Sequence, residues 1–220
     1  MKLNLLPRVN LERTELDGVR HYKTPSGIFP SVTTILGKYY DKSFLEAWRQ
    51  RVGAAEADKI SNKAAFAGTN LHSVFEKFLL NQDIKDCHSI DRMRFKSVEM
   101  KIADKITESY GAEYPVYSSK YKTAGTIDGI VKWNDDFAII DLKTAKSRKK
   151  EEYIENYFAQ AAIYGIMLNE LLIEWGSGKP LFQINKIVIV FSSNDFECYY
   201  FEKNLSDYTE LVNKIFIGNR

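Results

Sequence analysis

The sequence contains few cysteines. Cys87 and Cys198 are the only two in 220 residues, and their separation matches no metal-ligand or redox spacing. Two thiols cannot supply the four ligands of an iron–sulfur cluster, so none is expected. Both cysteines are interpreted as ordinary reduced thiols of an intracellular protein.

The sequence also lacks a large excess of charge. The formal net charge is +2, so the charge of the whole molecule gives no argument for nucleic-acid binding. Any basic surface that binds a polyanion must therefore be local. No internal repeat or low-complexity segment is present, and the oligomeric state stays open.

Long apolar runs are missing as well. No segment approaches membrane-spanning length, so no membrane partner is expected. The first twenty residues contain Glu12, Glu15 and Asp17 instead of the apolar stretch of a secretory signal. We therefore expect a cytoplasmic protein. With 45% hydrophobic residues, the chain can bury a full core and is expected to form one domain over residues 1–220.

The most informative segment is GTIDGIVKWNDDFAIIDLK, residues 125–143. Two strand-like arms flank a turn at residues 134–136, which predicts an antiparallel hairpin. Such a hairpin places Asp128 and Asp141 at comparable heights on adjacent strands, where their carboxylates repel unless a cation lies between them. Lys143 shares a strand face with Asp141. Two carboxylates and an ammonium favour phosphodiester hydrolysis.

An Asp-x-Lys sequence is uninformative by itself, because hairpins often carry surface charges. Here the apolar residues Ile139 and Ile140 lead directly into Asp141. Charges at the end of a buried strand need partners, which favours the functional interpretation.

Four motifs in order resemble the PD-(D/E)xK nuclease superfamily, in particular its RecB-like and Cas4-like exonuclease branch. They are Gly68-Thr69-Asn70-Leu71-His72, Gly125-Thr126-Ile127-Asp128-Gly129, Asp141-Leu142-Lys143 and Gln160-Ala161-Ala162-Ile163-Tyr164. The segments at residues 30–36 and 47–51 resemble the mitochondrial genome maintenance exonucleases and related phage exonucleases. The likeness spans roughly residues 20 to 165.

The resemblance implies a metal-dependent DNA exonuclease that acts on single-stranded DNA with a free end, in DNA replication, repair or recombination. A phage enzyme of this kind would work in the host cytoplasm. A structure-specific endonuclease, an inactive nucleic-acid-binding module of the same fold and a chance match of motifs are the alternatives. The implied fold is α/β, restriction-endonuclease-like, with a central mixed sheet flanked by helices.

The predicted metal is Mg²⁺ or Mn²⁺, because hard cations prefer oxygen ligands. Asp128, Asp141 and the Leu142 carbonyl are the predicted ligands, and Lys143 completes the catalytic set. A lone histidine on a helix is more often structural, but the resemblance places His72 beside the metal. It also makes Glu113 a candidate ligand, although a charge at a strand edge is nearly as good an interpretation.

Several residues are candidates for DNA contact. The run from residue 143 to 150 carries five basic side chains and leaves the metal site directly, so it either contacts phosphates or forms a solvated face. Gln160 and Tyr164 share a helix face and either contact DNA, as the resemblance implies, or close the helix onto the sheet. The remaining candidates are Thr144, Lys146, Arg148, Lys149, Lys150, Arg49 and Ser31.

The expected elements divide the chain into four parts. Residues 1–30 form an irregular arm to residue 17 and a hairpin over 19–29. Residues 31–110 form four helices. The first spans 31–36, with Ser31 as its N-cap and Gly37 at its end. The second begins at residue 43, the third runs from 62 or 63 to 80, and the fourth spans 89–110. The helices between residues 43 and 80 can arch over the active site. Residues 111–205 form the sheet with strands over 112–121, 125–143 and 186–201 and a helix over 151–172, and residues 206–220 form a last helix that begins at Ser206.

Overall fold

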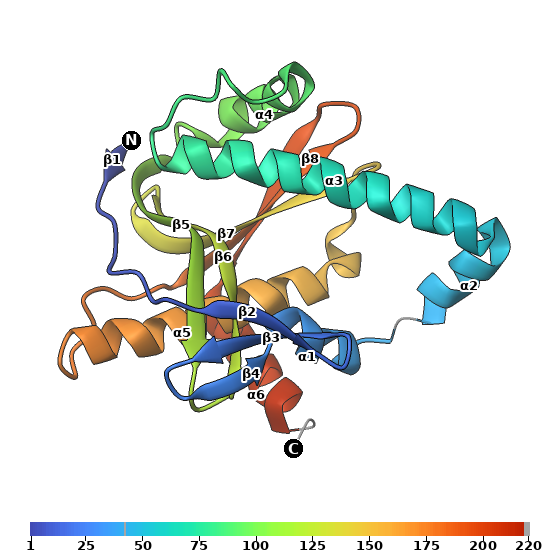
Figure 1. The fold of residues 1–220 in the computed structure, drawn as a ribbon. Coiled ribbons are helices and arrows are strands. Elements are labelled where there is room, and N and C mark those ends of the chain that lie inside the picture. Colours follow the sequence, from blue (N-terminus) through green and yellow to red (C-terminus); the bar gives the residue numbers. More distant parts are fainter. Residues whose placement is uncertain (42, 218–220) are drawn as a thin grey trace.

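Apolar strands form the centre of the molecule. The computed structural model describes residues 1–41 and 43–217 and contains a six-stranded mixed sheet of order β1-β5-β6-β7-β8-β9 (Figure 1). Its strands are β1 (Lys2–Leu3), β5 (Ile106–Ser118), β6 (Thr123–Trp133), β7 (Asp136–Ala145), β8 (Lys186–Ser193) and β9 (Cys198–Asn204). The pairs β1–β5 and β7–β8 are parallel, and the other neighbours are antiparallel.

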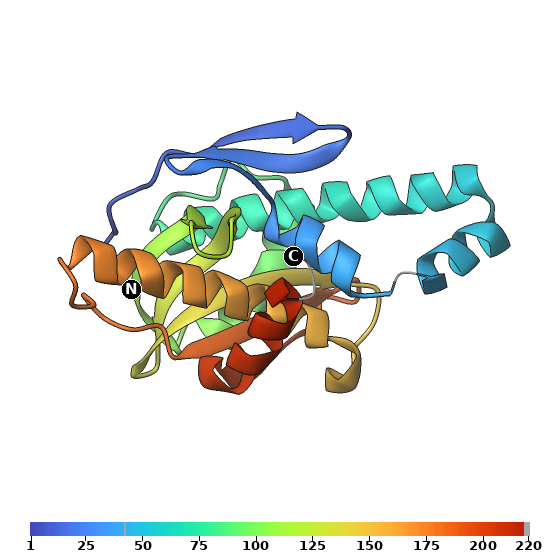
Figure 2. The same ribbon diagram turned by 90° about the horizontal axis from the view of Figure 1, so that it is seen from below.

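Helices cover both faces of this sheet (Figures 1 and 2). One face carries α1 (Val32–Tyr39), α5 (Glu155–Trp175) and α6 (Thr209–Ile217), and the other carries α3 (Ala54–Leu79) and α4 (Ser89–Ile102). Strand β8 shows the alternation that results: Ile187 and Ile189 join the core around α5, whereas Val188 and Val190 join the core beneath α3 and α4. The predicted α/β fold with a central mixed sheet flanked by helices is confirmed.

The helix α5 connects the parallel strands β7 and β8. It follows a short 3-10 turn, Glu151–Tyr153, and buries most of its length. Ala161 and Ala162 are fully buried, and their small side chains let the helix lie close to the sheet. This connection fixes Gln160 and Tyr164 beside the end of β7.

A second, smaller sheet lies next to β6. It consists of β2 (Glu12–Leu16), β3 (Val19–Thr24) and β4 (Gly27–Pro30), in that order. Tyr22 and Phe29 pack with Ala124 of β6 and attach this sheet to the main one. The predicted hairpin over residues 19–29 is present, but the expectation of an irregular arm to residue 17 is wrong for β1, which pairs with β5, and for β2. β2 is mostly exposed, so it has no apolar alternation to reveal it.

Several helix boundaries differ from the prediction, among them that of α5, which spans Glu155–Trp175 and not 151–172. α3 begins at Ala54, well before residues 62 and 63, because its first two turns are exposed apart from Ala57 and lack an apolar stripe. α1 continues through Gly37 to Tyr39, although Ser31 does cap its start by accepting the N–H of Thr34. α6 begins at Thr209 after a 3-10 turn, Leu205–Tyr208, and residues 218–220 of the predicted last helix lie outside the described residues.

The largest error concerns the segment from residue 89 to 110. α4 ends at Ile102, and the residues from Ile106 onward belong to β5. Ile106 continues the helical spacing of α4, so the apolar pattern alone does not mark the change. Gly111, predicted to end the helix, lies within β5 instead.

The helix α2 (Ser43–Val52) and the first half of α3 project away from the sheet (Figure 1). α2 has no buried residue, and Ala57 is the only buried residue in α3 before Leu71. Gly53 joins the two helices with φ +84°, a value that favours glycine. Within the described ranges, no helix combines the length and apolarity needed to cross a bilayer.

Candidate metal and catalytic site

The candidate site lies where β6 and β7 separate. Their antiparallel pairing runs from Trp133 and Asp136 to Gly129 and Ile140 and then stops. The earlier part of β6 turns towards β4, where Ala124 bridges to Ser31. The edge of β7 beyond Ile140 therefore loses its strand neighbour on this side, and its backbone groups need other partners.

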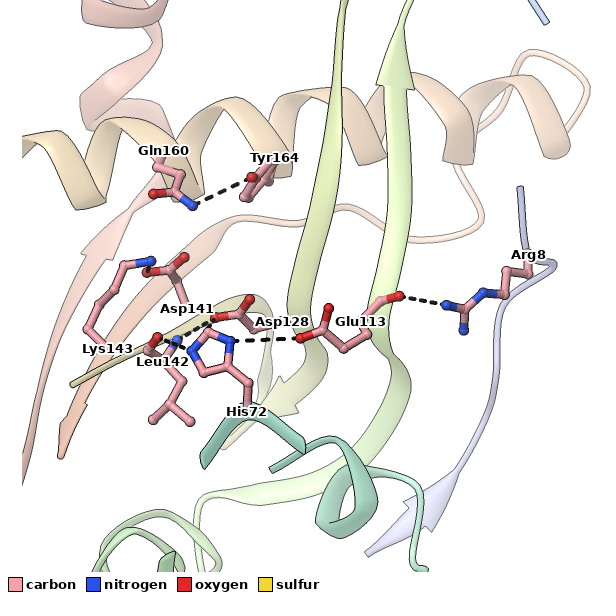
Figure 3. Close-up of polar contacts among 9 residues, drawn as sticks. All are labelled: Arg8, His72, Glu113, Asp128, Asp141, Leu142, Lys143, Gln160 and Tyr164. Atoms are coloured by element: carbon pink, nitrogen blue, oxygen red, sulfur yellow. Dashed lines mark hydrogen bonds and ion pairs between the residues drawn. The ribbon is translucent and has the colours of Figure 1, made fainter. Parts of the chain in front are cut away.

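Side chains supply those partners at Leu142 (Figure 3). The Leu142 N–H donates to Oδ2 of Asp128 at 2.8 Å, and the Leu142 carbonyl lies 2.7 Å from Nε2 of His72. A carbonyl only accepts, so Nε2 donates in this contact, and Nδ1 is the ring nitrogen left to face a metal ion. The N–H and the carbonyl of one residue of β7 thus hold Asp128 and His72 close together.

His72 reaches β7 because α3 lies unusually close to the sheet. A Cβ built on Gly129 would come within 2.6 Å of Leu79 Cδ1, so a larger residue here would force the Leu79 side chain of α3 to move. Nδ1 of His72 lies 3.8 Å from Oε1 of Glu113, and Nε2 lies 3.8 Å from Oδ2 of Asp128.

Glu113 occupies an unusual backbone position. Its φ is +42°, a left-handed value that is uncommon for a residue with a side chain. Ala112 packs beneath α3 and α4 whereas Tyr114 packs against α5, so the alternation of β5 reverses at Glu113. Nη2 of Arg8 donates to the Glu113 carbonyl at 2.7 Å and supports this conformation.

His72, Glu113 and Asp128 can share one metal ion. One ligand atom from each of these residues lies within 4.8 Å of the others. Burial and, second, the charge of Asp128 together raise the pKa of Glu113 to about 7, while His72 opposes the shift. A divalent cation relieves this repulsion, and the oxygen-rich donor set fits a hard divalent ion.

Asp141 and Lys143 form a separate ion pair, in which Asp141 is buried and the Lys143 side chain is 20% exposed. Nζ of Lys143 lies 2.6 Å from Oδ2 of Asp141, whose residue is only 1% exposed. Burial raises the pKa of Asp141, which the Lys143 charge opposes. Burial lowers the pKa of Lys143, but the negative charges of Asp141 and Asp128 outweigh this effect, so the pKa is raised overall. Lys143 is therefore a cation at neutral pH.

The pair lies on the opposite side of β7 from His72. Ile139 faces α5 whereas Ile140 and Leu142 face α3 and α4, so Asp141 and Lys143 project towards α5. Nζ of Lys143 accordingly lies 5.3 Å from the ring centroid of Tyr157. The sequence predicts Asp128 and Asp141 as ligands of one or two metal ions. In the structure the Asp141 carboxylate points to Lys143, whereas Asp128 lies beside His72 (Figure 3).

Tyr164 closes the α5 side of the site. Its ring lies so close to Gly125 that a Cβ there would come within 2.6 Å of Tyr164 Cε1. Nε2 of Gln160 donates to the Tyr164 hydroxyl at 3.5 Å, a long contact. Burial raises the pKa of Tyr164, so its hydroxyl stays protonated. Tyr164 is 4% exposed, so a DNA strand can contact it only from inside the site and not from the outer surface.

The predicted basic run follows β7 out of the site. Lys146, Arg148, Lys149 and Lys150 are exposed, and Thr144 is half-buried. Arg148 pairs with Glu197 at 2.8 Å and lies over the Tyr199 ring, and Lys150 lies 3.7 Å from Glu152. Lys146 and Lys149 have no ion-pair partner among the described residues, so they are the freer cations of the run.

Arg49 and Ser31 lie apart from the metal cluster. Arg49, on the projecting helix α2, forms an exposed ion pair with Asp58 of α3 at 2.7 Å. Ser31 is 2% exposed, and its hydroxyl contacts those of Thr33 and Thr34 besides capping α1. We therefore leave Ser31 out of the DNA interface proposed below.

Nothing in the sequence pattern indicates a role for Arg8. Its contact with Glu113 spans 105 residues and joins a coil segment to the middle of a strand. Neither end carries a local pattern that predicts the contact. The positive φ of Glu113 is not predictable from the sequence either, because glutamate rarely occupies such a position.

No family model and no curated protein sequence matches the chain. Among solved structures, it is similar to the protein SSO0001, with 15% identity, a TM-score of 0.38 and coverage of 79% of this chain and 70% of that one. It is also similar to a candidate exonuclease from Eubacterium rectale, with 11% identity, a TM-score of 0.40 and coverage of 70% and 69%. These scores are too low to carry an argument, so the chemistry of the site rests on its own residues.

Proposed function

We propose that the chain is a divalent-metal-dependent deoxyribonuclease that digests single-stranded DNA from a free end. The observation that carries the proposal is the arrangement around Leu142. Its peptide groups hold Asp128 and His72, while its two neighbours in the chain form the Asp141–Lys143 pair. A cation site and a fixed ammonium thus meet at one residue, and the motif resemblance points to the same chemistry.

The metal site suits Mg²⁺ or Mn²⁺. Glu113 and Asp128 offer carboxylate oxygens, the Leu142 carbonyl adds a neutral oxygen, and His72 adds one nitrogen. When bound, such an ion acidifies water and neutralises charge on a phosphodiester oxygen. Asp141 has one of two roles in this proposal: it binds a second metal ion, or it orients Lys143.

Lys143 serves as an electrostatic stabiliser. Its pKa is raised by Asp141 and Asp128 against the effect of burial, so it holds its proton at neutral pH and cannot take one from water. A fixed ammonium stabilises the negative charge that develops on the phosphate during attack. Asp141 restricts the lysine to one position through the 2.6 Å contact.

The DNA strand approaches along exposed cations. Lys146 and Lys149 follow the site directly, and Arg148 and Lys150 lie at the rim with acidic neighbours. Gln160 presents its amide beside Tyr164. The projecting α2 and α3 enclose the strand, so that an end must thread past them, and Arg49 lies on this arm.

A cleavage time course tests the proposal. End-labelled linear single strands, duplexes and closed circular single strands are incubated with Mg²⁺, Mn²⁺ or EDTA. We expect metal-dependent shortening of linear single strands, no cleavage of circles and no activity in Lys143→Ala or Asp128→Asn. Asp135→Asn, at the far end of the same hairpin, is the matched control and should retain activity.

Three outcomes would reject parts of the proposal. Full activity on circles would show an endonuclease. Cleavage in EDTA would remove the metal from the mechanism. Binding without cleavage under either metal would show a nucleic-acid-binding module instead.

A further inference from the structure

A cavity of about 560 Å³ lies beside the metal cluster, between the N-terminal arm, the small sheet and the strands β5 and β6. Its polar and aromatic lining comes from Arg8, Asn10, Arg13, Tyr22, Glu113 and Thr126. Its volume falls within the range of about 300–1,000 Å³ that is usual for small-molecule pockets. None of these residues except Glu113 belongs to the catalytic set described above.

The cavity and the metal cluster share Glu113. Glu113 belongs to both, since its carboxylate lies 3.8 Å from Nδ1 of His72 and its residue lines the cavity. Thr126 precedes Asp128 by two residues on β6, and Pro115 follows Glu113 by two on β5. The cavity therefore begins at the cluster and extends along both strands towards the small sheet.

Two arginines give the cavity positive charge. Arg8 uses one N–H on the Glu113 carbonyl, which leaves other donors of its guanidinium available. Arg13 lies opposite Tyr22 in the pairing of β2 with β3. Within the described part of the chain, neither arginine forms an ion pair. By contrast Lys23, on the other face of the small sheet, pairs with Glu12 at 2.9 Å.

We infer that this cavity binds one nucleotide of the DNA strand, next to the phosphodiester that reaches the cluster of His72, Glu113 and Asp128. The inference rests on the proposed nuclease function and names a substrate subsite for it. Arg8 and Arg13 each hold one phosphate of the strand at this nucleotide, because a guanidinium matches phosphate geometry with two parallel hydrogen bonds.

The other lining residues suit the remainder of a nucleotide. Asn10 and Thr126 offer an amide and a hydroxyl to the sugar and the base edge. Tyr22 is 8% exposed and is fixed by packing with Phe29 and Ala124, so it forms a rigid aromatic wall. Aromatic walls hold bases without strong sequence preference.

A salt titration of DNA binding tests the inference. The affinity of the full chain for a labelled single-stranded oligothymidine is measured in EDTA at several KCl concentrations. Arg13→Gln should weaken binding and reduce the slope of log K against log salt by about 0.7, the value for one phosphate contact on a single strand. Lys23→Gln removes the same charge from the opposite face of the small sheet and should keep the wild-type slope.

The cavity and the nuclease proposal can fail separately. If the wild type cleaves DNA but Arg13→Gln matches Lys23→Gln in affinity and slope, the subsite is rejected and the nuclease stands. If the wild type shows an Arg13-dependent slope but never cleaves, the subsite stands and the nuclease is rejected. A wild type that does not bind single-stranded DNA rejects both.

A second variant tests the same inference if Arg13→Gln does not fold. Arg8→Gln should reduce the slope by a similar amount in the same titration. Because Arg8 also contacts Glu113, Mn²⁺ affinity is measured in parallel. A slope unchanged from the wild type in Arg8→Gln rejects the subsite.

Discussion

Asp128 and Leu142 are joined by a hydrogen bond in which the Leu142 N–H donates to Oδ2 of Asp128 at 2.8 Å. The bond forms just beyond the last paired residues of β6 and β7, where the sheet no longer provides a carbonyl. The carboxylate therefore replaces a backbone acceptor and becomes part of the sheet. This places Asp128 within 3.8 Å of His72, so the position of the proposed metal ligand depends on strand separation.

Substitutions at Asp128 should distinguish its hydrogen bond to the Leu142 N–H from its proposed role as a metal ligand. Asp128→Asn keeps an oxygen that can accept the Leu142 N–H, whereas Asp128→Ala leaves that buried group unpaired. We expect Asp128→Ala to be less stable than Asp128→Asn by about 1–3 kcal/mol in EDTA, measured by urea unfolding. Both variants should bind Mn²⁺ at least about tenfold more weakly, measured by calorimetry. Equal stability of the two would show that the hydrogen bond contributes little.

Glu113 should make the metal-free protein sensitive to pH. Its pKa is raised from 4.5 to about 7 by burial and by Asp128. Stability from this group is fully present below the unfolded pKa and is lost as pH rises through about 7. Glu113→Gln should therefore stabilise the protein by on the order of 1 kcal/mol at about pH 8, after allowance for partial exposure, and by little near pH 4.

The measurement for Glu113 is thermal unfolding in EDTA across this pH range. Mn²⁺ should reverse the order at high pH, because it stabilises the wild-type carboxylate and not the amide. A wild type and a Glu113→Gln variant with the same pH dependence would show that the carboxyl titrates normally.

The hairpin was predictable because each step of its chemistry is local. Turn residues at 134–136, alternation in the arms and the two-residue spacing of Asp141 and Lys143 predict two paired strands and a close Asp–Lys pair, and both are present. The apolar β8 likewise predicts a covered strand. Local patterns suffice where the partner is nearby in sequence or where burial is complete.

The remaining features depend on contacts distant in sequence. Nothing local separates the end of α4 from the start of β5, because Ile106 fits both patterns. The left-handed backbone of Glu113 is supported by Arg8, far away in the chain. The assignment of Asp128 to the cluster and of Asp141 to Lys143 follows from the separation of β6 and β7, which only the assembled sheet determines.

Removing Lys143 should destabilise the protein in a pH-dependent way. Lys143→Met leaves the buried Asp141 without its partner, which costs about 3–5 kcal/mol where the carboxylate is charged. Burial already raises the pKa of Asp141, and loss of Lys143 raises it further, so the cost falls as the pH is lowered and the group takes up a proton. Urea unfolding at about pH 5 and about pH 8 measures the difference.

The double variant Asp141→Asn/Lys143→Met distinguishes structure from catalysis. It removes both charges of the pair, so it should recover most of the stability at high pH. It should still lack nuclease activity if the ammonium stabilises the reacting phosphate. A double variant that cleaves DNA at the wild-type rate would give the pair a purely structural role.

Gly125 and Gly68 should respond in opposite directions to the same change. An alanine Cβ at Gly125 would come within 2.6 Å of the Tyr164 ring, so Gly125→Ala should cost about 1–3 kcal/mol and displace Tyr164. At Gly68, inside α3, the nearest atom is Thr144 Oγ1 at 3.8 Å. Gly68→Ala should therefore gain about 0.5–1 kcal/mol from helix propensity.

Thermal unfolding of both glycine variants, with Tyr164→Ala and Gly125→Ala/Tyr164→Ala, measures this contrast. Removing the ring removes the clash, so the double variant should be more stable than the sum of the two single effects implies. Additive effects would mean that Gly125→Ala acts through the strand backbone and not through Tyr164. Because Tyr164 closes the α5 side of the site, coupling between the two residues would also tie the glycine of the Asp128 strand to the geometry around Lys143.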